Sequence, residues 1–257
     1  MVARPRARAQ RRGEASHPAA PASGRVPSID ALRGVAIVAM IAYHFAFDLR
    51  FFGVTRSDFE HDPFWLASRG AIVASFLALA GVSAVLADRA GIDTWRFARR
   101  IGVIVLCALA VSVASYVVFP RTFIYFGVLH CIAVSLVIAR PLVRFPLACA
   151  VLGVLVIIAG LVFAHPMFDQ RWTSWIGFTT GKPATQDYVP LFPWLGVLLL
   201  GVAAGHALAA NGFRPLESLT RTPTPLRAMG RHSLAIYMVH QPMLMALLWA
   251  ALKILRS

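Results

Sequence analysis

Four polar side chains in the first apolar stretch of the sequence are spaced so that they could act together. They are Asp30, Arg33, His44 and Asp48. At about 100° per residue, Arg33 and His44 lie about 20° apart around a helix, and Asp48 follows His44 by one turn. A neutral imidazole can take a proton from an amine or a hydroxyl, and a carboxylate one turn away can fix its tautomer. The spacing predicts a catalytic pair, with His44 as general base and Asp48 as the group that orients it.

Further ionisable residues lie in or beside other apolar stretches. A charged side chain at the centre of a bilayer costs about 2.5–3.5 kcal/mol on insertion scales, so each one needs a reason. We expect them to converge with the first stretch and to support one pocket; the alternative is a structural polar seam of hydrogen-bonded core residues. The predicted supporting residues are Arg33, Arg69, His130, Asp187 and His240.

The chemistry that such a pair could support is acyl transfer to an amine or a hydroxyl group. A second group of basic residues could then bind the anionic phosphates of a thioester donor. Guanidinium groups form strong bidentate hydrogen bonds with phosphate. The predicted donor-binding residues are Arg96, Arg99, Arg100 and Arg231. Membrane topology alone would also enrich arginine there. The sequence has no Walker A loop, dinucleotide-binding glycine motif or HExxH motif, and its three cysteines have no paired spacing, so we expect no metal site.

The composition indicates the fold that must position these residues. Apolar residues make up 58% of the 257 residues and charged residues 14%, against about 25% charged in soluble domains. Lipid admits only helices and closed barrels, and continuous apolar runs of about 20 residues indicate helices. We therefore predict an all-α, polytopic transmembrane bundle of about seven spans. They cover about 31–50, 64–87, 101–119, 124–139, 145–164, 190–209 and 233–255.

The basic residues predict the orientation of these spans. The sequence has 25 Lys and Arg against 11 Asp and Glu, which in a membrane protein indicates the positive-inside rule rather than nucleic-acid binding. With the N-terminus inside, 16 basic residues fall in inner segments and 7 in outer ones. We expect residues 1–27 to be a retained, disordered, basic cytoplasmic tail rather than an export or transit signal. Residues 28–257 would form one transmembrane acyltransferase-like domain.

The order of several blocks resembles a known family. SIDALRGVAIVAMIAYHFAFDLRFFG, DYVPLFPWLGVLLLGVAAG and GRHSLAIYMVHQPML are similar to blocks of bacterial members of the heparan-alpha-glucosaminide N-acetyltransferase catalytic-domain family. The resemblance covers residues 28–255. It implies acetyl transfer from cytoplasmic acetyl-CoA to an amino sugar or another glycan outside. The wider acyltransferase pattern places its first-helix Arg and His on Arg33 and His44. Animal members instead carry the catalytic histidine in the following segment, where this sequence has His61.

These observations lead to one principal hypothesis and two alternatives. We expect an integral membrane acyltransferase, located in a bacterial inner membrane, with acetyl-CoA as donor substrate and no prosthetic group. Its partners would be the lipid bilayer and a glycan or amino-sugar acceptor, with no nucleic acid and with homo-oligomerisation left open. The alternatives are a proton-coupled transporter or flippase of a polar or lipid-linked substrate, because intramembrane His and Asp also form proton relays, and a non-enzymatic membrane component.

Overall fold

The computed structural model describes residues 26–255, so nearly all of the predicted tail 1–27 lies outside the described residues. Within this range the chain is all-helical, which confirms the predicted fold class. The α-helices are α1 (Pro27–Phe51), α2 (Pro63–Arg89), α3 (Thr94–Val118), α4 (Val128–Ala139), α5 (Pro146–Val162), α6 (Leu191–Ala210), α7 (Thr224–Arg231) and α8 (Ser233–Leu255). Short 3-10 helices are η1 (Arg140–Leu142), η2 (Pro166–Phe168), η3 (Ser174–Ile176) and η4 (Arg214–Arg221).

Five of the described helices are long and apolar enough to cross a membrane, namely α1, α2, α3, α6 and α8. The other two predicted spans correspond to α4 and α5, which have 12 and 17 residues. At about 1.5 Å per residue, α4 is about 18 Å long, short of the roughly 30 Å of hydrocarbon. It begins at Val128 rather than near 124, because the backbone before Gly127 is irregular. The number of complete crossings therefore stays a prediction.

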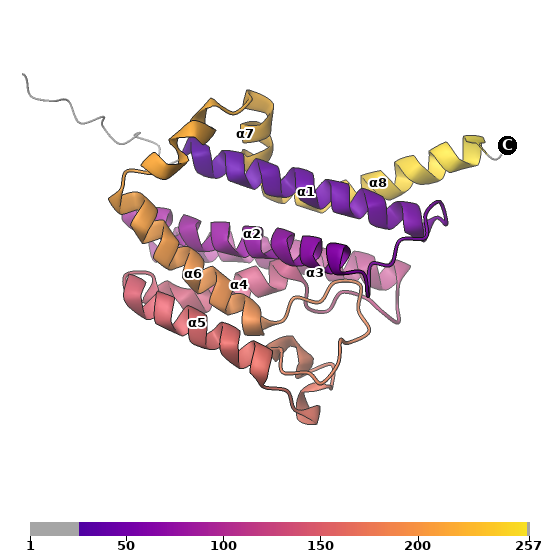
Figure 1. Ribbon diagram of the computed structural model, residues 1–257, viewed down its shortest axis with the longest axis horizontal. Coiled ribbons are helices and arrows are strands. Elements are labelled where there is room, and N and C mark those ends of the chain that lie inside the picture. Colours follow the sequence, from indigo (N-terminus) through magenta and orange to yellow (C-terminus); the bar gives the residue numbers. More distant parts are fainter. Residues whose placement is uncertain (1–25, 256–257) are drawn as a thin grey trace, which may run out of the picture.

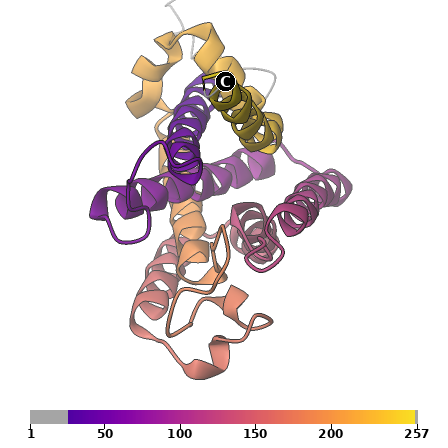
Figure 2. The same cartoon turned by 90° about the vertical axis from the view of Figure 1, so that its right-hand side faces the viewer.

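The helices run roughly along one axis and define two ends of the bundle (Figure 1). We call the end formed by residues 88–100, 140–145 and 210–232 the arginine end. Arg140 there donates to the Ile92 carbonyl at 3.1 Å, and Arg144 pairs with Asp88 at 3.3 Å. We call the end formed by residues 52–62, 119–127 and 163–190 the loop end; it also carries the C-terminus of α8 (Figures 1 and 2).

Local sequence signals account for where several helices begin. Pro27, Pro63 and Pro146 each stand at the start of a helix, where the fixed φ of proline is favourable and its missing N–H is not needed. Asp62 accepts from the Phe64 N–H at 2.8 Å, and Asp93 accepts from the Arg96 N–H at 2.7 Å. These N-caps satisfy donors that have no partner within the helix.

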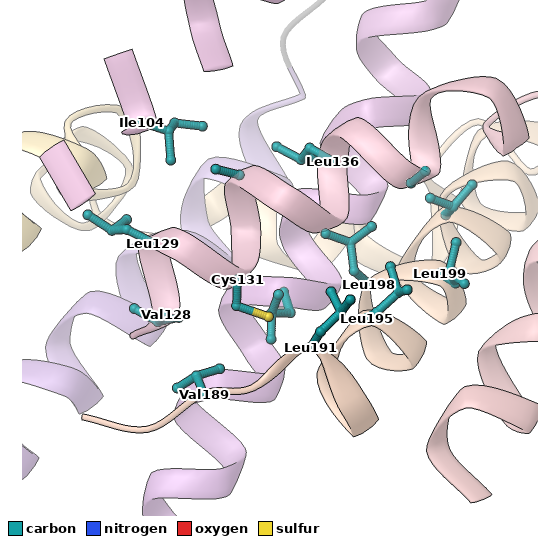
Figure 3. Packing of buried hydrophobic residues seen from close by; sticks show 14 of the residues in the cluster. Ile104, Val128, Leu129, Cys131, Leu136, Val189, Leu191, Leu195, Leu198 and Leu199 are labelled. Carbon is teal, nitrogen blue, oxygen red and sulfur yellow. The ribbon is translucent and has the colours of Figure 1, made fainter. Parts of the chain in front are cut away.

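The main hydrophobic core lies between α2, α4 and α6 (Figure 3). Leu77 of α2, Cys131 of α4 and Leu198 of α6 are fully buried there. By contrast, much of the apolar surface of α3 and α5 is exposed, including Leu106 and Leu161. Exposed apolar helices of this kind are typical of lipid-facing surfaces.

Two glycine contacts bring backbones close together. A Cβ atom at Gly81 of α2 would meet the carbonyl oxygen of Leu198 on α6. A Cβ atom at Gly230 of α7 would meet the carbonyl oxygen of Asp30 on α1. The second contact seats α7 against the first turns of α1 and so sets where the following helix, α8, begins.

We predict that Gly81→Ala destabilises the bundle by about 1–3 kcal/mol, because the added methyl group overpacks a backbone contact. Gly70 is the matched control, since it lies on the same helix and a Cβ there meets open space. Gly70→Ala should be neutral or should stabilise α2 by up to about 1 kcal/mol through helix propensity. Thermal unfolding of both variants in detergent measures the difference, and equal melting temperatures would contradict the assigned α2–α6 contact.

Candidate functional site

The arginine end of α1 carries a partly buried ion pair. Arg33 Nη1 donates to Asp30 Oδ1 at 2.7 Å, and Nη2 donates to Ser83 Oγ of α2 at 2.5 Å. Ser83 in turn donates its own proton to the Leu79 carbonyl. The guanidinium group, the serine hydroxyl and the backbone carbonyl thus form one hydrogen-bonded network. Such hydrogen bonds are the condition for keeping a charge inside an apolar bundle. Sequence reasoning missed Ser83, because it is one of three serines in α2 and nothing in the sequence distinguishes it from the other two.

A cavity of about 530 Å³ begins at this network. Arg33 and the three predicted donor-binding arginines of α3 line it, together with Phe76, Leu79 and Ile104 among its apolar residues. It extends to Tyr237 on α8 and to Val128 at the start of α4. The four lining arginines are Arg33, Arg96, Arg99 and Arg100.

A second cavity of about 420 Å³ adjoins the first and shares Arg33 and Arg100 with it. Arg231, the remaining predicted donor-binding residue, lines this second cavity with Asp30. The residues predicted from sequence to bind the donor are therefore brought together around two cavities that share lining residues at the arginine end.

The position of the α3 arginines depends on Arg140 at the end of α4. Besides its bond to Ile92, Arg140 places its guanidinium 4.7 Å from the ring centroid of Phe97. Ile92 precedes the N-cap of α3, and Phe97 follows Arg96, so both contacts hold the first turns of α3. Arg140 was not among the predicted site residues, because positive charge near a helix end is ordinary in membrane proteins.

The predicted catalytic residues lie where α1 meets α8. The rings of His44 and His240 are in edge contact, with centroids 4.9 Å apart. Asp48 is 1% exposed and its Oδ1 accepts from Gln241 Nε2 at 2.7 Å. Among residues 26–255 no hydrogen bond joins Asp48 to His44, so the predicted orientation of His44 by Asp48 stays a prediction.

His240 has a defined tautomer when its ring is neutral. Its Nδ1 lies 2.7 Å from the Tyr237 carbonyl, which can only accept, so Nδ1 carries the proton. Nε2 is then a lone-pair acceptor; it is buried and has no partner within the described part of the chain. The ring centroids of Tyr237 and His240 are 5.7 Å apart. Tyr237 also lines the larger cavity. The contact between the Tyr237 and His240 rings is therefore the step between that cavity and the histidine pair.

Arg69 and Asp187 form a second polar group toward the loop end. Arg69 Nη2 donates to the Tyr188 carbonyl at 2.7 Å, and Asp187 Oδ2 accepts from the Val128 N–H at 3.1 Å. Burial raises the pKa of Asp187, while the Arg69 guanidinium and the Val128 N–H act in the opposite direction. Tyr43, next to His44, lies within electrostatic reach of both charges. Asp187 thereby serves as a cap on the N-terminus of α4, where a carboxylate is favourable.

The His130 side chain forms hydrogen bonds that hold the backbone before α4 in place. Its Nδ1 accepts from the Gly127 N–H at 3.2 Å, and its Nε2 lies 3.3 Å from Ser112 Oγ. Ser112 itself donates to the Ile124 carbonyl at 2.6 Å. With Nδ1 accepting, Nε2 carries the proton and donates to Ser112, so both ring nitrogens are occupied. This arrangement gives His130 a structural role within the predicted supporting set.

His61 lies apart from these groups on the surface of the loop end. Its side chain is 82% exposed and pairs with Asp58 at 3.0 Å. The Glu60 N–H, followed by the contacts of His61, holds the pKa of Asp58 below its usual value. Phe59, between these residues, is buried against Tyr43 with ring centroids 5.4 Å apart. The loop that carries His61 thus packs, through Phe59, against Tyr43, the residue before His44.

These features define a helical integral membrane protein with a polar site enclosed by its helices. Residues 25–242 match the family described as heparan-alpha-glucosaminide N-acetyltransferase, catalytic, and the chain belongs to that family of membrane acetyltransferases. No curated protein and no solved structure matches the chain. Among residues 26–255, no group of three or more His, Cys, Asp or Glu side chains is placed to hold a metal ion.

We predict that His130→Ala lowers the free energy of unfolding by about 1–3 kcal/mol, the cost of leaving a buried Gly127 N–H without its acceptor. Thermal unfolding in detergent measures this loss. His240→Ala is the comparison, because it removes the Nδ1–H bond to the Tyr237 carbonyl but leaves no backbone N–H without its acceptor. Unchanged stability of the His130 variant together with lost activity would assign His130 to the chemistry instead.

Proposed function

We propose that this protein transfers an acetyl group from acetyl-CoA to an amino sugar or another glycan acceptor. The observation that carries the proposal is the cavity of about 530 Å³ that leads from Arg33 and the α3 arginines to Tyr237, beside the histidine pair. A donor with anionic phosphates at one end and a neutral, extended arm suits a space that is cationic at one end and apolar along its length.

The donor phosphates would meet the arginine end. Arg96, Arg99, Arg100 and Arg231 would bind them, with Arg33 at the junction of the two cavities. The acyl-bearing arm would pass between α2, α3 and α4, where Phe76, Leu79 and Ile104 form an apolar lining. This arrangement would deliver the thioester carbonyl toward Tyr237 and the residues beyond it.

The chemical step would take place at the contact between α1 and α8. The acceptor nitrogen or oxygen attacks the thioester carbonyl and forms the new acyl bond. His44 takes the proton of the attacking group, the carbon–sulfur bond breaks, and the sulfur of coenzyme A leaves as the thiolate and then takes up a proton. His240, in ring contact with His44, would support it, as would Asp48, Arg69 and Asp187 on the acceptor side.

Sidedness follows from the charge distribution. The arginine end would face the cytoplasm under the positive-inside rule, and the loop end would face outward. The predicted N-terminal tail would then be cytoplasmic, and residues 28–257 would form one domain that carries the acetyl group across a bacterial inner membrane.

We predict that replacing an α3 arginine weakens donor binding more than it slows chemistry. Arg99→Gln should raise the KM for acetyl-CoA about 5- to 30-fold, the equivalent of 1–2 kcal/mol, with a smaller change in kcat. Arg144→Gln is the matched control: it also lies at the arginine end but pairs with Asp88 outside both cavities. Steady-state kinetics with labelled acetyl-CoA measures both, and an equal effect of the two variants would contradict the donor site.

We predict that His44→Ala lowers acetyl transfer by about 10²–10⁴-fold, the usual cost of losing a general base. The protein, reconstituted in liposomes, is supplied with labelled acetyl-CoA and a panel of amino-sugar acceptors. Stabilisation by acetyl-CoA in a thermal shift assay should persist in the variant, because His44 lies beyond the residues that line either cavity.

His61→Ala is the control that separates the two histidines. It should retain transfer, because His61 is exposed and lies outside the α1–α8 contact. If His61→Ala abolishes turnover and His44→Ala does not, the base belongs to the loop. If no acceptor is acetylated and a polar substrate instead drives proton flux, the protein is a transporter and the proposal fails.

A further inference from the structure

The contact between Asp48 and Gln241 leaves two buried oxygen atoms unexplained. Gln241 Nε2 donates to Asp48 Oδ1 at 2.7 Å. The second oxygen of each group, Asp48 Oδ2 and Gln241 Oε1, is buried and has no hydrogen-bond partner among the described residues. Both atoms can only accept, so these two oxygens cannot satisfy each other when Asp48 is ionised. A buried acceptor without a hydrogen bond is costly, so the presence of two such acceptors at one contact needs an explanation.

The surroundings of Asp48 contrast with those of Asp30 on the same helix. Both carboxyl groups are buried, but Asp30 has the Arg33 guanidinium at 2.7 Å, whereas Asp48 faces a neutral amide. The ion pairs within residues 26–255 do not include Asp48. The titratable groups at the contact are His44 on α1 and His240 on α8. A buried carboxylate without a cation is strongly disfavoured relative to the neutral acid.

We propose that Asp48 is a neutral carboxylic acid joined to Gln241 by two hydrogen bonds. Gln241 Nε2–H donates to Asp48 Oδ1, and the added proton on Asp48 Oδ2 donates to Gln241 Oε1. A single proton thereby satisfies both orphan oxygens and removes an unpaired buried charge. A carboxylic acid and a primary amide are complementary in this way, because each offers one donor and one acceptor along the same edge.

This pair makes Asp48 a positioning residue. Gln241 follows His240 on α8, and Asp48 lies one turn after His44 on α1, so the pair holds together the two helix segments that carry the histidine rings. Asp48 then acts on the site through Gln241 and α8 rather than by orienting His44 directly. The effect on catalysis rests on the proposed function, whereas the protonation of Asp48 does not.

Infrared difference spectroscopy of the purified full-length protein tests the proposal. The wild-type protein at neutral pH should show the C=O stretching band of a protonated carboxyl group, and Asp48→Asn should remove it. The matched control is Asp30→Asn, which should leave the band in place because the Asp30 carboxyl group is paired with the Arg33 guanidinium at 2.7 Å. The melting temperature of Asp48→Asn should stay close to that of the wild type, because an asparagine amide can repeat both bonds to Gln241, whereas Asp48→Ala should lower it.

Gln241→Ala provides a second measurement on the same band. Loss of the amide donor should shift the Asp48 C=O band to higher frequency without abolishing it. A band that is absent from the wild type, or that neither Asp48→Asn nor Gln241→Ala changes, would overturn the proposal. For the positioning role, Asp48→Asn should keep most of kcat and Asp48→Ala should lose it; equal loss in both would assign an ionised Asp48 to the chemistry. The spectra remain informative even if no acetyl transfer is found.

Discussion

The absence of water inside an apolar bundle is the constraint on which the structure depends. Every polar group on α1 must find its partner within the protein, because lipid offers none. Asp30 and Arg33 meet this demand with each other and with Ser83. Asp48 meets it with Gln241 on α8. The polar face of α1 is therefore turned inward, and α2 and α8 are the helices that cover it.

The close seating of α7 on α1 determines which residues of α8 reach that face. Gly230 lets α7 approach the backbone of Asp30, so α7 packs on the first turns of α1, and α8, which follows α7, runs alongside α1. His240, seven residues into α8, then comes level with His44, which lies much further along α1. The same offset brings Tyr237 to the end of the cavity that starts at Arg33. A glycine contact far from the histidines thus helps to align the histidine pair with the cavity that ends at Tyr237.

At the loop end, side chains replace the helical hydrogen bonds that the short α4 lacks. His130 and Asp187 accept from the N–H groups of Gly127 and Val128. Ser112 donates to the Ile124 carbonyl, and Thr185 donates to the Phe123 carbonyl at 2.8 Å. These bonds let the chain leave helical geometry without orphaned backbone groups. They also tie the segment before α6 to the start of α4, which places Asp187 within electrostatic reach of Arg69.

The sequence by itself determined the helical class, the approximate positions of the apolar helices and the family, because apolar run length and local blocks are properties of contiguous residues. It also indicated that Arg33, His44 and Asp48 share one face, since helical periodicity is fixed at about 100° per residue. It did not reveal that Asp48 bonds to Gln241, or that both ring nitrogens of His130 are used in hydrogen bonds before α4. It also did not indicate that Arg140 supports the first turns of α3. The bonds of Asp48 and Arg140 join residues more than 40 positions apart, and the bond between His130 and Ser112 joins two helices 18 positions apart. Only the tertiary structure decides them, because the partner of a buried polar atom is set by which helix packs against it and at what height.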